Sequence, residues 1–274
     1  MSAVRRPLKS LGQNFLVDQN IVERIIRSAK LLPGDAVLEI GPGRGALTGY
    51  LAQQAGRLLL VEYDHALAAD LTARFRDDRR VTVVDGDVLA LDLDALLREE
   101  QSRWKVVANL PYNISTQVLF RLLEIRSRLS RMVLMLQKEV GDRLAAQPDT
   151  SDYGVTTVLL GLWFDMRREF IVSSGCFHPR PKVESAVISF VPLAAPRVEV
   201  GSEEIFRRVV KGAFAMRRKT LANCLKRAEL CAVDELAAVL EECGINGQRR
   251  GETLSMEEFA SLSRALSGKT VVAG

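Results

Sequence analysis

Short apolar runs alternate with amphipathic stretches along roughly the first 140 residues of the chain. Each run ends close to a glycine, an amide residue or an acidic residue. Uninterrupted runs of this kind are typical of strands that are buried on both faces of a parallel sheet. Between the runs, apolar residues recur at helical spacing, as Ile21, Val22, Ile25 and Ile26 do. The pattern predicts strands at residues 36–38, 57–61, 81–84, 105–108 and 132–136.

The second half of the chain changes from this alternation to a purely helical pattern. Residues 167–172 and 187–191 are predicted to be strands, and residues 155–163 fit either a helix or a buried strand. Prolines in residues 192–196 indicate a linker, after which helices are expected at 203–215, 218–229, 233–242 and 256–266. We therefore predict an α/β fold, with a Rossmann-like sheet covered by helices on both faces in residues 1–192. A small all-α domain is expected in residues 197–274.

A glycine-rich turn follows the first predicted strand, where the chain reads Glu39-Ile40-Gly41-Pro42-Gly43-Arg44-Gly45. Glycines let a ligand approach the backbone, and the following helix offers free N–H groups. Glu62 ends the second strand, where an acidic side chain can bind ribose hydroxyls, and Asp87 follows the third strand at the same sheet edge. The turn departs from the dinucleotide pattern, so S-adenosylmethionine, which has no pyrophosphate, fits better than NAD. A tight turn without a ligand is the remaining alternative.

The fourth predicted strand leads into Asn109-Leu110-Pro111-Tyr112, the most specific motif in the sequence. An amino group on an aromatic base is a poor nucleophile because its lone pair is delocalised into the ring. An Asn oxygen and a backbone carbonyl that accept its hydrogens favour a pyramidal nitrogen, and a tyrosine face can stack the base. Proline fixes the turn. The motif therefore fits a site that activates an exocyclic amine, although a plain strand-to-helix turn would also tolerate these residues.

Two further segments carry candidate contacts. Before the first helix, Leu11-Gly12-Gln13-Asn14-Phe15-Leu16 places two amides between apolar neighbours, where they could also satisfy only local backbone groups. Residues 176–185 form an extended loop rich in proline. Such a loop can present Phe177 to a flipped base and Arg180 or Lys182 to phosphate.

Charge and composition limit the kinds of site and partner. The four cysteines and two histidines have no spacing typical of a zinc site or a disulfide framework, so we expect no metal. The chain has no run of about 18 or more apolar residues and no signal sequence, which predicts a cytoplasmic protein without a membrane partner. The net charge is only +4, but residues 207–227 contain eight Lys or Arg and no acidic residue. Their densest point, Arg217, Arg218 and Lys219, fits either a nucleic-acid surface or a solvated helix face.

Together these motifs resemble the rRNA adenine N6-methyltransferase family, in the family's order and over nearly the whole chain. The motifs are residues 11–16, 39–45, 109–112, 177–183 and 217–221. The resemblance implies a class I methyltransferase fold and S-adenosylmethionine as the cofactor. The branch that the chain is most similar to dimethylates two adjacent adenines in the 3′-terminal hairpin loop of small-subunit rRNA. A monomer that acts on the small ribosomal subunit during its biogenesis is therefore expected.

The resemblance also implies roles for single residues. The cofactor would contact Asn14, Leu16, Gly41, Gly43, Glu62, Asp87 and Asn109. The target adenine would contact Asn109, Leu110, Pro111, Tyr112 and Phe177. The small helical domain with Arg217, Arg218 and Lys219 would face the rRNA.

Two alternatives remain open. The Erm type modifies an adenine of large-subunit rRNA and has similar core motifs, although residues 12–16 and 217–225 favour the small-subunit branch. A non-catalytic RNA-binding assembly factor with the same fold is the other alternative. The intact motif at residues 109–112 argues against a loss of chemistry, but not against a second role.

Overall fold

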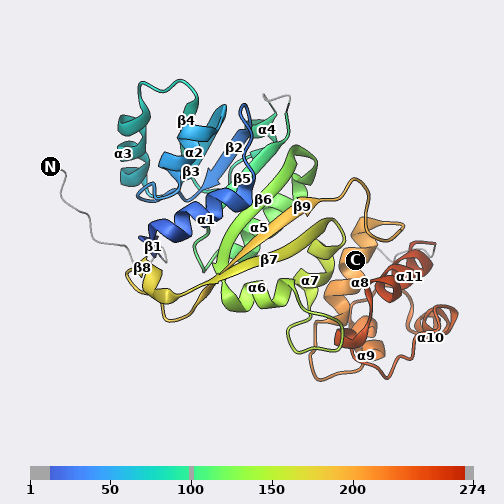
Figure 1. Ribbon diagram of the computed structural model, residues 1–274. Helices are drawn as coiled ribbons and strands as arrows, with labels where there is room; N and C mark the ends of the chain where they lie inside the picture. The colour runs from blue at the N-terminus through green and yellow to red at the C-terminus, as the bar shows by residue number, and fades with distance from the viewer. Residues whose placement is uncertain (1–12, 99–101, 269–274) are drawn as a thin grey trace. The chain divides into compact units, whose positions relative to one another are not determined.

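The computed structural model describes residues 13–98 and 102–268 (Figure 1). The chain divides into two compact units. The first consists of Met1–Gly141 and Asp165–Pro192, and the second of Asp142–Phe164 and Leu193–Gly274.

A seven-stranded sheet with the order β4-β3-β2-β5-β6-β9-β7 forms the centre of the first unit. Neighbouring strands from β4 to β6 are parallel, and β9 is antiparallel to β6. Most residues of β2, β3, β5 and β6 are buried, which accounts for the uninterrupted apolar runs in the sequence. The strands are β2 (Ala36–Ile40), β3 (Arg57–Glu62), β4 (Val81–Asp85), β5 (Trp104–Asn109), β6 (Leu129–Gln137), β7 (Phe164–Val172) and β9 (Ser185–Pro192).

Helices cover both faces of this sheet (Figure 1). They are α1 (Gln19–Ala29), α2 (Thr48–Gln54), α3 (His65–Phe75), α4 (Leu93–Leu97), α5 (Ser115–Glu124) and α6 (Lys138–Leu144). On one face, α1, α2 and α3 contribute Ile25, Leu51 and Leu71 to a single apolar core. The carboxylates of Asp18 and Asp64 accept from N–H groups in the first turns of α1 and α3, and so fix where these helices begin.

A separate two-stranded sheet links segments from the start and the end of the first unit. β1 (Phe15–Leu16) pairs antiparallel with β8 (Phe177–His178), and Leu16 lies opposite Phe177. The N–H of Val17 also donates to the Cys176 carbonyl at 2.9 Å. The sequence does not predict these strands, because two residues are too few to show a period.

The second unit is helical. Its elements are α7 (Val155–Gly161), α8 (Glu203–Ala213), α9 (Leu221–Arg227), α10 (Val233–Glu242), η4 (Gly251–Thr253) and α11 (Met256–Ser267). α8 packs against α7, α9 and α11, and α10 packs against α9 and α11. The buried rings of Phe206 and Phe259 fill the centre of this bundle.

Residues 142–164 lie in the second unit, whereas the sequence pattern places them in the first domain. Within the second unit, the Arg197 N–H donates to the Leu162 carbonyl at 2.8 Å, and the Tyr153 ring lies edge-on to Phe214 with 5.9 Å between centroids. The apolar pattern of residues 155–163 shows that they are buried, but not against which partner. The division into a methyltransferase domain (1–192) and an RNA-docking domain (197–274) stays a prediction.

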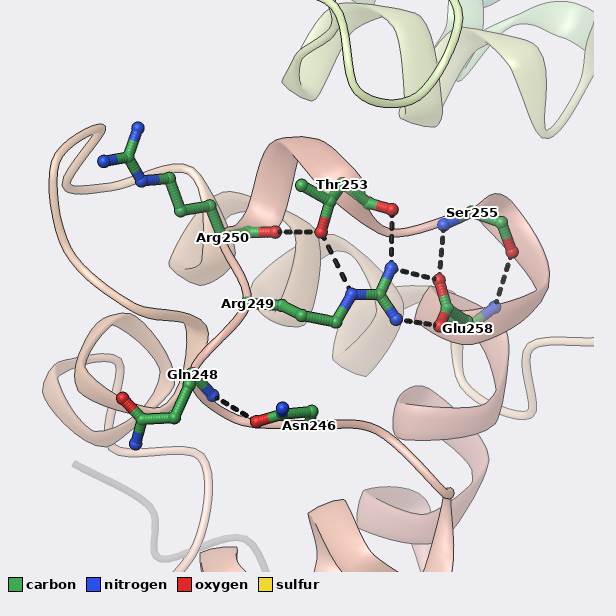
Figure 2. Close-up of polar contacts among 7 residues, drawn as sticks. All are labelled: Asn246, Gln248, Arg249, Arg250, Thr253, Ser255 and Glu258. Atoms are coloured by element: carbon green, nitrogen blue, oxygen red, sulfur yellow. Dashed lines mark hydrogen bonds and ion pairs between the residues drawn. The ribbon is translucent and has the colours of Figure 1, made fainter.

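A charged network holds the loop between α10 and α11 (Figure 2). The Arg249 guanidinium pairs with the Glu258 carboxylate and donates to the Thr253 carbonyl at 2.6 Å. Glu258 and Ser255 form a capping box at the start of α11. The Leu221 N–H, at the start of α9, donates to the Arg249 carbonyl at 2.7 Å. The network therefore fixes the position at which α9 begins.

Candidate active site

A cavity of about 620 Å³ lies in the first unit at the carboxyl ends of β2, β3 and β5. Its wall is formed by β1 and its flanking residues, the glycine turn, and the chain after β3, β4 and β5. Ten predicted site residues line it: Asn14, Leu16, Gly41, Gly43, Glu62, Asp87, Asn109, Leu110, Pro111 and Tyr112. Residues 11 and 12 of the N-terminal motif lie outside the described residues. The structure thus places three separate sequence motifs, together with Glu62 and Asp87, around one space.

The glycine turn between β2 and α2 depends on a backbone conformation that side chains disfavour. Gly41, Gly43 and Gly45 have φ angles of +65°, +58° and +79°. The Gly41 N–H donates to the Val61 carbonyl at 2.9 Å, and the Gly45 N–H donates to the Pro42 carbonyl at 2.8 Å. The turn is therefore held by backbone groups, which lets a ligand lie against the main chain.

The Glu62 carboxylate stands at the end of β3 and is buried. Its Oε2 accepts from the Gly43 N–H at 2.8 Å, and its Oε1 accepts from the Asp64 N–H at 2.9 Å. Burial raises the pKa of Glu62, and the hydrogen bonds from these two N–H groups oppose that shift. Each oxygen has a second lone pair, so the carboxylate can accept from ligand hydroxyls while it holds the glycine turn.

A second carboxylate, Glu39, is also among the residues that line the cavity. Its side chain is 2% exposed, and its Oε2 has no hydrogen-bond partner in the described part of the chain. Burial raises the pKa of Glu39 to about 8, and the nearby Glu62 adds to this rise. The nearby Thr48 hydroxyl and Arg74 have the opposite effect and lower the pKa. Glu39 is therefore mainly protonated at neutral pH. The sequence pattern gives it no separate role.

The Asn109 amide at the end of β5 is oriented by the N-terminal segment. Its Nδ2 donates to the Asn14 carbonyl at 3.2 Å, which leaves Oδ1 to accept from a ligand. The next peptide is fixed as well, because the Leu110 N–H donates to the Met135 carbonyl at 3.1 Å. Contacts with other parts of the fold thus hold the Asn109 amide and the peptide that joins Asn109 to Leu110.

Tyr112 makes a contact that the sequence cannot show. Its hydroxyl is 2.7 Å from the Oγ of Ser185, the first residue of β9, and burial raises the pKa of the phenol. The sequence offers no local signal for this pair, because the two residues lie in different motifs. The sequence motifs also leave out Tyr63, although it follows Glu62 directly, lines the cavity and is 57% exposed. The signal that could have identified Tyr63 is its position as an aromatic residue next to the carboxylate that ends a strand.

Three predicted site residues of the first unit are absent from the described cavity lining. Phe177 is only 4% exposed and lies in the same apolar core as Leu16. Arg180 is exposed, and its Nε donates to the Ser174 Oγ at 3.0 Å. Lys182 is exposed on the same loop. Base stacking by Phe177 and phosphate binding by the two cations stay predictions.

The remaining predicted RNA contacts lie in the second unit, on the loop between α8 and α9. Arg217, Arg218 and Lys219 are all exposed. Arg217 and Lys219 also line a cavity of about 320 Å³ in this unit, together with Arg143 and Arg250. Positive side chains from three segments therefore gather beside the predicted docking loop.

Metal-binding clusters and membrane-spanning helices are both absent from residues 13–98 and 102–268. That part of the chain contains no group of three or more His, Cys, Asp or Glu side chains placed to hold a metal ion. None of its helices is long and apolar enough to cross a membrane.

Comparison with known proteins agrees with this architecture. The ribosomal RNA adenine dimethylase family matches residues 5–267. The ribosomal RNA small subunit methyltransferase A of Geobacter metallireducens is 58% identical over 263 residues, which are 95% of this chain and 96% of that protein. Two similar solved structures are a dimethyladenosine transferase from Plasmodium falciparum and the 23S rRNA methyltransferase ErmE.

The two structures confirm the predicted class I methyltransferase fold. The Plasmodium falciparum enzyme has a TM-score of 0.77 at 24% identity and covers 90% of this chain and 95% of its own. ErmE has a TM-score of 0.68 at 26% identity and covers 93% of this chain and 100% of its own. The family match and the identity to the Geobacter protein confirm the predicted family: this chain belongs to the ribosomal RNA adenine dimethylases.

Proposed function

We propose that the enzyme transfers methyl groups from S-adenosylmethionine to N6 of two adjacent adenines in the 3′-terminal hairpin loop of small-subunit rRNA. The observation that carries this proposal is that residues 109–112 line the same cavity as the glycine turn and Glu62. One space thus combines groups suited to a nucleoside cofactor with groups suited to an aromatic amine. We further propose that it acts as a cytoplasmic monomer on the small ribosomal subunit during its biogenesis.

The lining suits a ligand that is cationic and donates hydrogen bonds. Glu62 and Asp87 supply carboxylates, Glu39 supplies a carboxyl group that is mainly protonated at neutral pH, and Arg44 is the only Lys or Arg among the described lining residues. S-adenosylmethionine offers an ammonium, ribose hydroxyls and an adenine amine as donors, whereas the pyrophosphate of NAD would place negative charge among these carboxylates. Glu62 would accept from the ribose hydroxyls. Asp87, whose Oδ1 holds the Leu89 N–H at 2.9 Å, would accept from the adenine amine.

S-adenosylmethionine, when bound, supplies an electrophilic methyl group. The Asn109 Oδ1 and the Leu110 carbonyl would accept from the two N6 hydrogens, which favours a lone pair that lies out of the ring plane. The same acceptors stabilise the positive charge that develops on N6 during attack. The Tyr112 ring would hold the adenine by stacking. N6 loses one proton in each transfer, and this proton passes to solvent because neither acceptor is a base.

Sequence similarity supports small-subunit rRNA as the substrate. The relative named for the small subunit is 58% identical, whereas ErmE, named for 23S rRNA, is 26% identical. Methylation of large-subunit rRNA is the second candidate function, because ErmE shares the fold over 93% of this chain. The exposed cations Arg217, Arg218 and Lys219 would bind rRNA phosphate in either case.

Primer extension on rRNA from a strain that lacks this gene tests the substrate. Dimethylated adenines stop the polymerase, so the wild-type gene should restore a stop at two adjacent adenines near the small-subunit 3′ end. Asn109→Ala should not restore it, because loss of one oriented polar group lowers turnover by roughly a hundredfold or more. The matched control is Asn20→Ala, which removes an exposed amide at the start of α1 and should behave like the wild type.

The other outcomes are equally informative. A restored stop in large-subunit rRNA would assign the Erm-type activity. A wild-type stop in the Asn109→Ala strain would show that residues 109–112 form only a turn.

A further inference from the structure

The hydrogen bond between Tyr112 and Ser185 joins the predicted catalytic turn to a strand from the far end of the first unit. Tyr112 lines the cavity three residues after β5, and its hydroxyl lies 2.7 Å from the Ser185 Oγ. Ser185 is completely buried and does not line the cavity in the described part of the chain. Its hydroxyl therefore acts on the site only through Tyr112.

The Ser185 hydroxyl is held rigidly by the sheet. Ser185 opens β9 and lies in register with Gln137, at the end of β6 (Figure 1). The carbonyl of the preceding residue, Glu184, accepts from the Lys138 N–H at 2.9 Å. This bond and the pairing with Gln137 thus fix the backbone of the serine. A hydroxyl held in this way is a fixed anchor for a neighbouring phenol.

The geometry of a tyrosine side chain determines what this anchor can do. The phenol oxygen lies on the axis about which the ring rotates, so a hydrogen bond to it leaves that rotation unrestrained. The bond instead fixes the direction of the axis, which is set by χ1.

We propose that Ser185 is a positioning residue for methyl transfer, because its hydroxyl fixes the direction of the Tyr112 ring axis and so keeps the ring where the target adenine stacks on it. This inference rests on the stacking role proposed above for Tyr112. The anchor does not touch the cofactor residues, so it should affect the methyl transfer step and leave cofactor binding unchanged.

Three variants and one control test the inference. Ser185→Ala removes the anchor, Tyr112→Phe removes its partner, and the double variant removes both. Ser189→Ala is the matched control, since Ser189 lies in the same strand, is 4% exposed and donates to the Glu169 carboxylate at 2.6 Å instead. Each protein is assayed for kcat and for KM of both substrates on small subunits. Stacking is followed by the fluorescence of 2-aminopurine placed at the target position of the hairpin.

We expect kcat to fall by about threefold to tenfold in each single variant, as for loss of one neutral hydrogen bond. The double variant should be no slower than the slower single variant, because both changes remove the same contact. The 2-aminopurine should be less stacked, KM for the cofactor should be unchanged, and the control should match the wild type. If Ser185→Ala does not fold, Tyr112→Phe with the same readouts decides the question.

Unchanged kcat in Ser185→Ala and Tyr112→Phe, or additive losses in the double variant, would overturn the inference. Tyr112→Ala separates it from the proposed function. If Tyr112→Ala abolishes stacking and turnover while Ser185→Ala and Tyr112→Phe match the wild type, only the role proposed for Ser185 is wrong. If Tyr112→Ala leaves stacking and turnover intact, the stacking role itself is wrong.

Discussion

Two buried carboxylates with different partners lie at the carboxyl ends of β2 and β3. Glu62 accepts hydrogen bonds from two N–H groups, whereas the Glu39 Oε2 has no partner in the described part of the chain. A buried carboxylate without hydrogen-bond donors is stabilised by taking up a proton. Two residues of the same type therefore differ: Glu62 is suited to holding hydroxyl groups, whereas Glu39 is mainly protonated at neutral pH.

Replacement of Glu62 tests the cofactor assignment. Glu62→Ala should weaken binding of S-adenosylmethionine by about 1.5–3 kcal/mol, since it removes charge-assisted hydrogen bonds to the ribose. Titration calorimetry measures this loss, and RNA affinity should change little. Glu23→Ala, an exposed glutamate in α1, is the control and should bind the cofactor normally. Unaltered cofactor affinity in Glu62→Ala would rule out the ribose contact.

The raised pKa of Glu39 predicts how stability depends on pH. Between the ordinary pKa of 4.5 and about 8, the folded protein binds more protons than the unfolded chain at this residue. The free energy of unfolding should therefore fall as the pH rises through this interval. Glu39→Gln cannot titrate and should lose this part of the pH dependence. Urea unfolding of both proteins across the interval provides the measurement, and parallel curves would show that the pKa of Glu39 is ordinary.

At the scale of whole elements, the sequence predicts the strands that have a recognisable apolar pattern. It misses contacts between residues that lie far apart along the chain. Apolar runs identify β2, β3, β5 and β6, because strands buried on both faces are mostly apolar, and a shorter run identifies the edge strand β4. The residues that follow these strands meet at one edge, so the sequence alone is enough to place the glycine turn, Glu62 and Asn109 together. It cannot place the β1–β8 pair or the Tyr112–Ser185 bond, since no local pattern records a partner far along the chain.

The burial of Phe177 in β8 decides how its predicted stacking role must be tested. Phe177→Ala would remove about 3–5 kcal/mol of stability, as in other cores, and would hide any catalytic effect. Phe177→Leu keeps most of the apolar volume, so its cost in unfolding free energy should stay below about 1.5 kcal/mol. If the ring stacks the target base, turnover in this variant should still fall, by the equivalent of about 1–3 kcal/mol.

Phe190→Leu provides the control for this experiment. Phe190 is a fully buried ring in β9, so the same replacement should cost similar stability and leave turnover unchanged. Equal turnover in the two leucine variants would restrict Phe177 to a packing role.

At the scale of the whole molecule, a net charge of +4 conceals an uneven distribution. Arg217, Arg218 and Lys219 are exposed on one loop of the second unit. Cations that neutralise phosphates displace counterions, so each one adds somewhat under one unit to the slope of log affinity against log salt. A charge that only faces solvent adds nothing to this slope.

A triple variant, Arg217→Ala, Arg218→Ala and Lys219→Ala, should therefore reduce the slope for rRNA binding by roughly two to three units. Affinity measured across a salt series tests this, with cofactor binding as the check on folding. Arg76→Ala, Arg79→Ala and Arg98→Ala together remove three exposed cations from the first unit and should leave the slope nearly unchanged. If the two triple variants behave alike, the RNA surface lies elsewhere, for example at Arg180 and Lys182.

The pairing of β1 with β8 has a consequence for how the enzyme folds during its synthesis. Phe15 and Leu16 leave the ribosome early in synthesis, but His178 and Phe177, the residues they pair with, follow only after most of the chain has been made. A contact over so long a loop forms late, because the ends of a long segment must first be brought together. In a nascent or truncated chain that ends before β8, the N-terminal segment has no strand to pair with. Synthesis itself therefore delays completion of the cavity until the first unit is nearly whole.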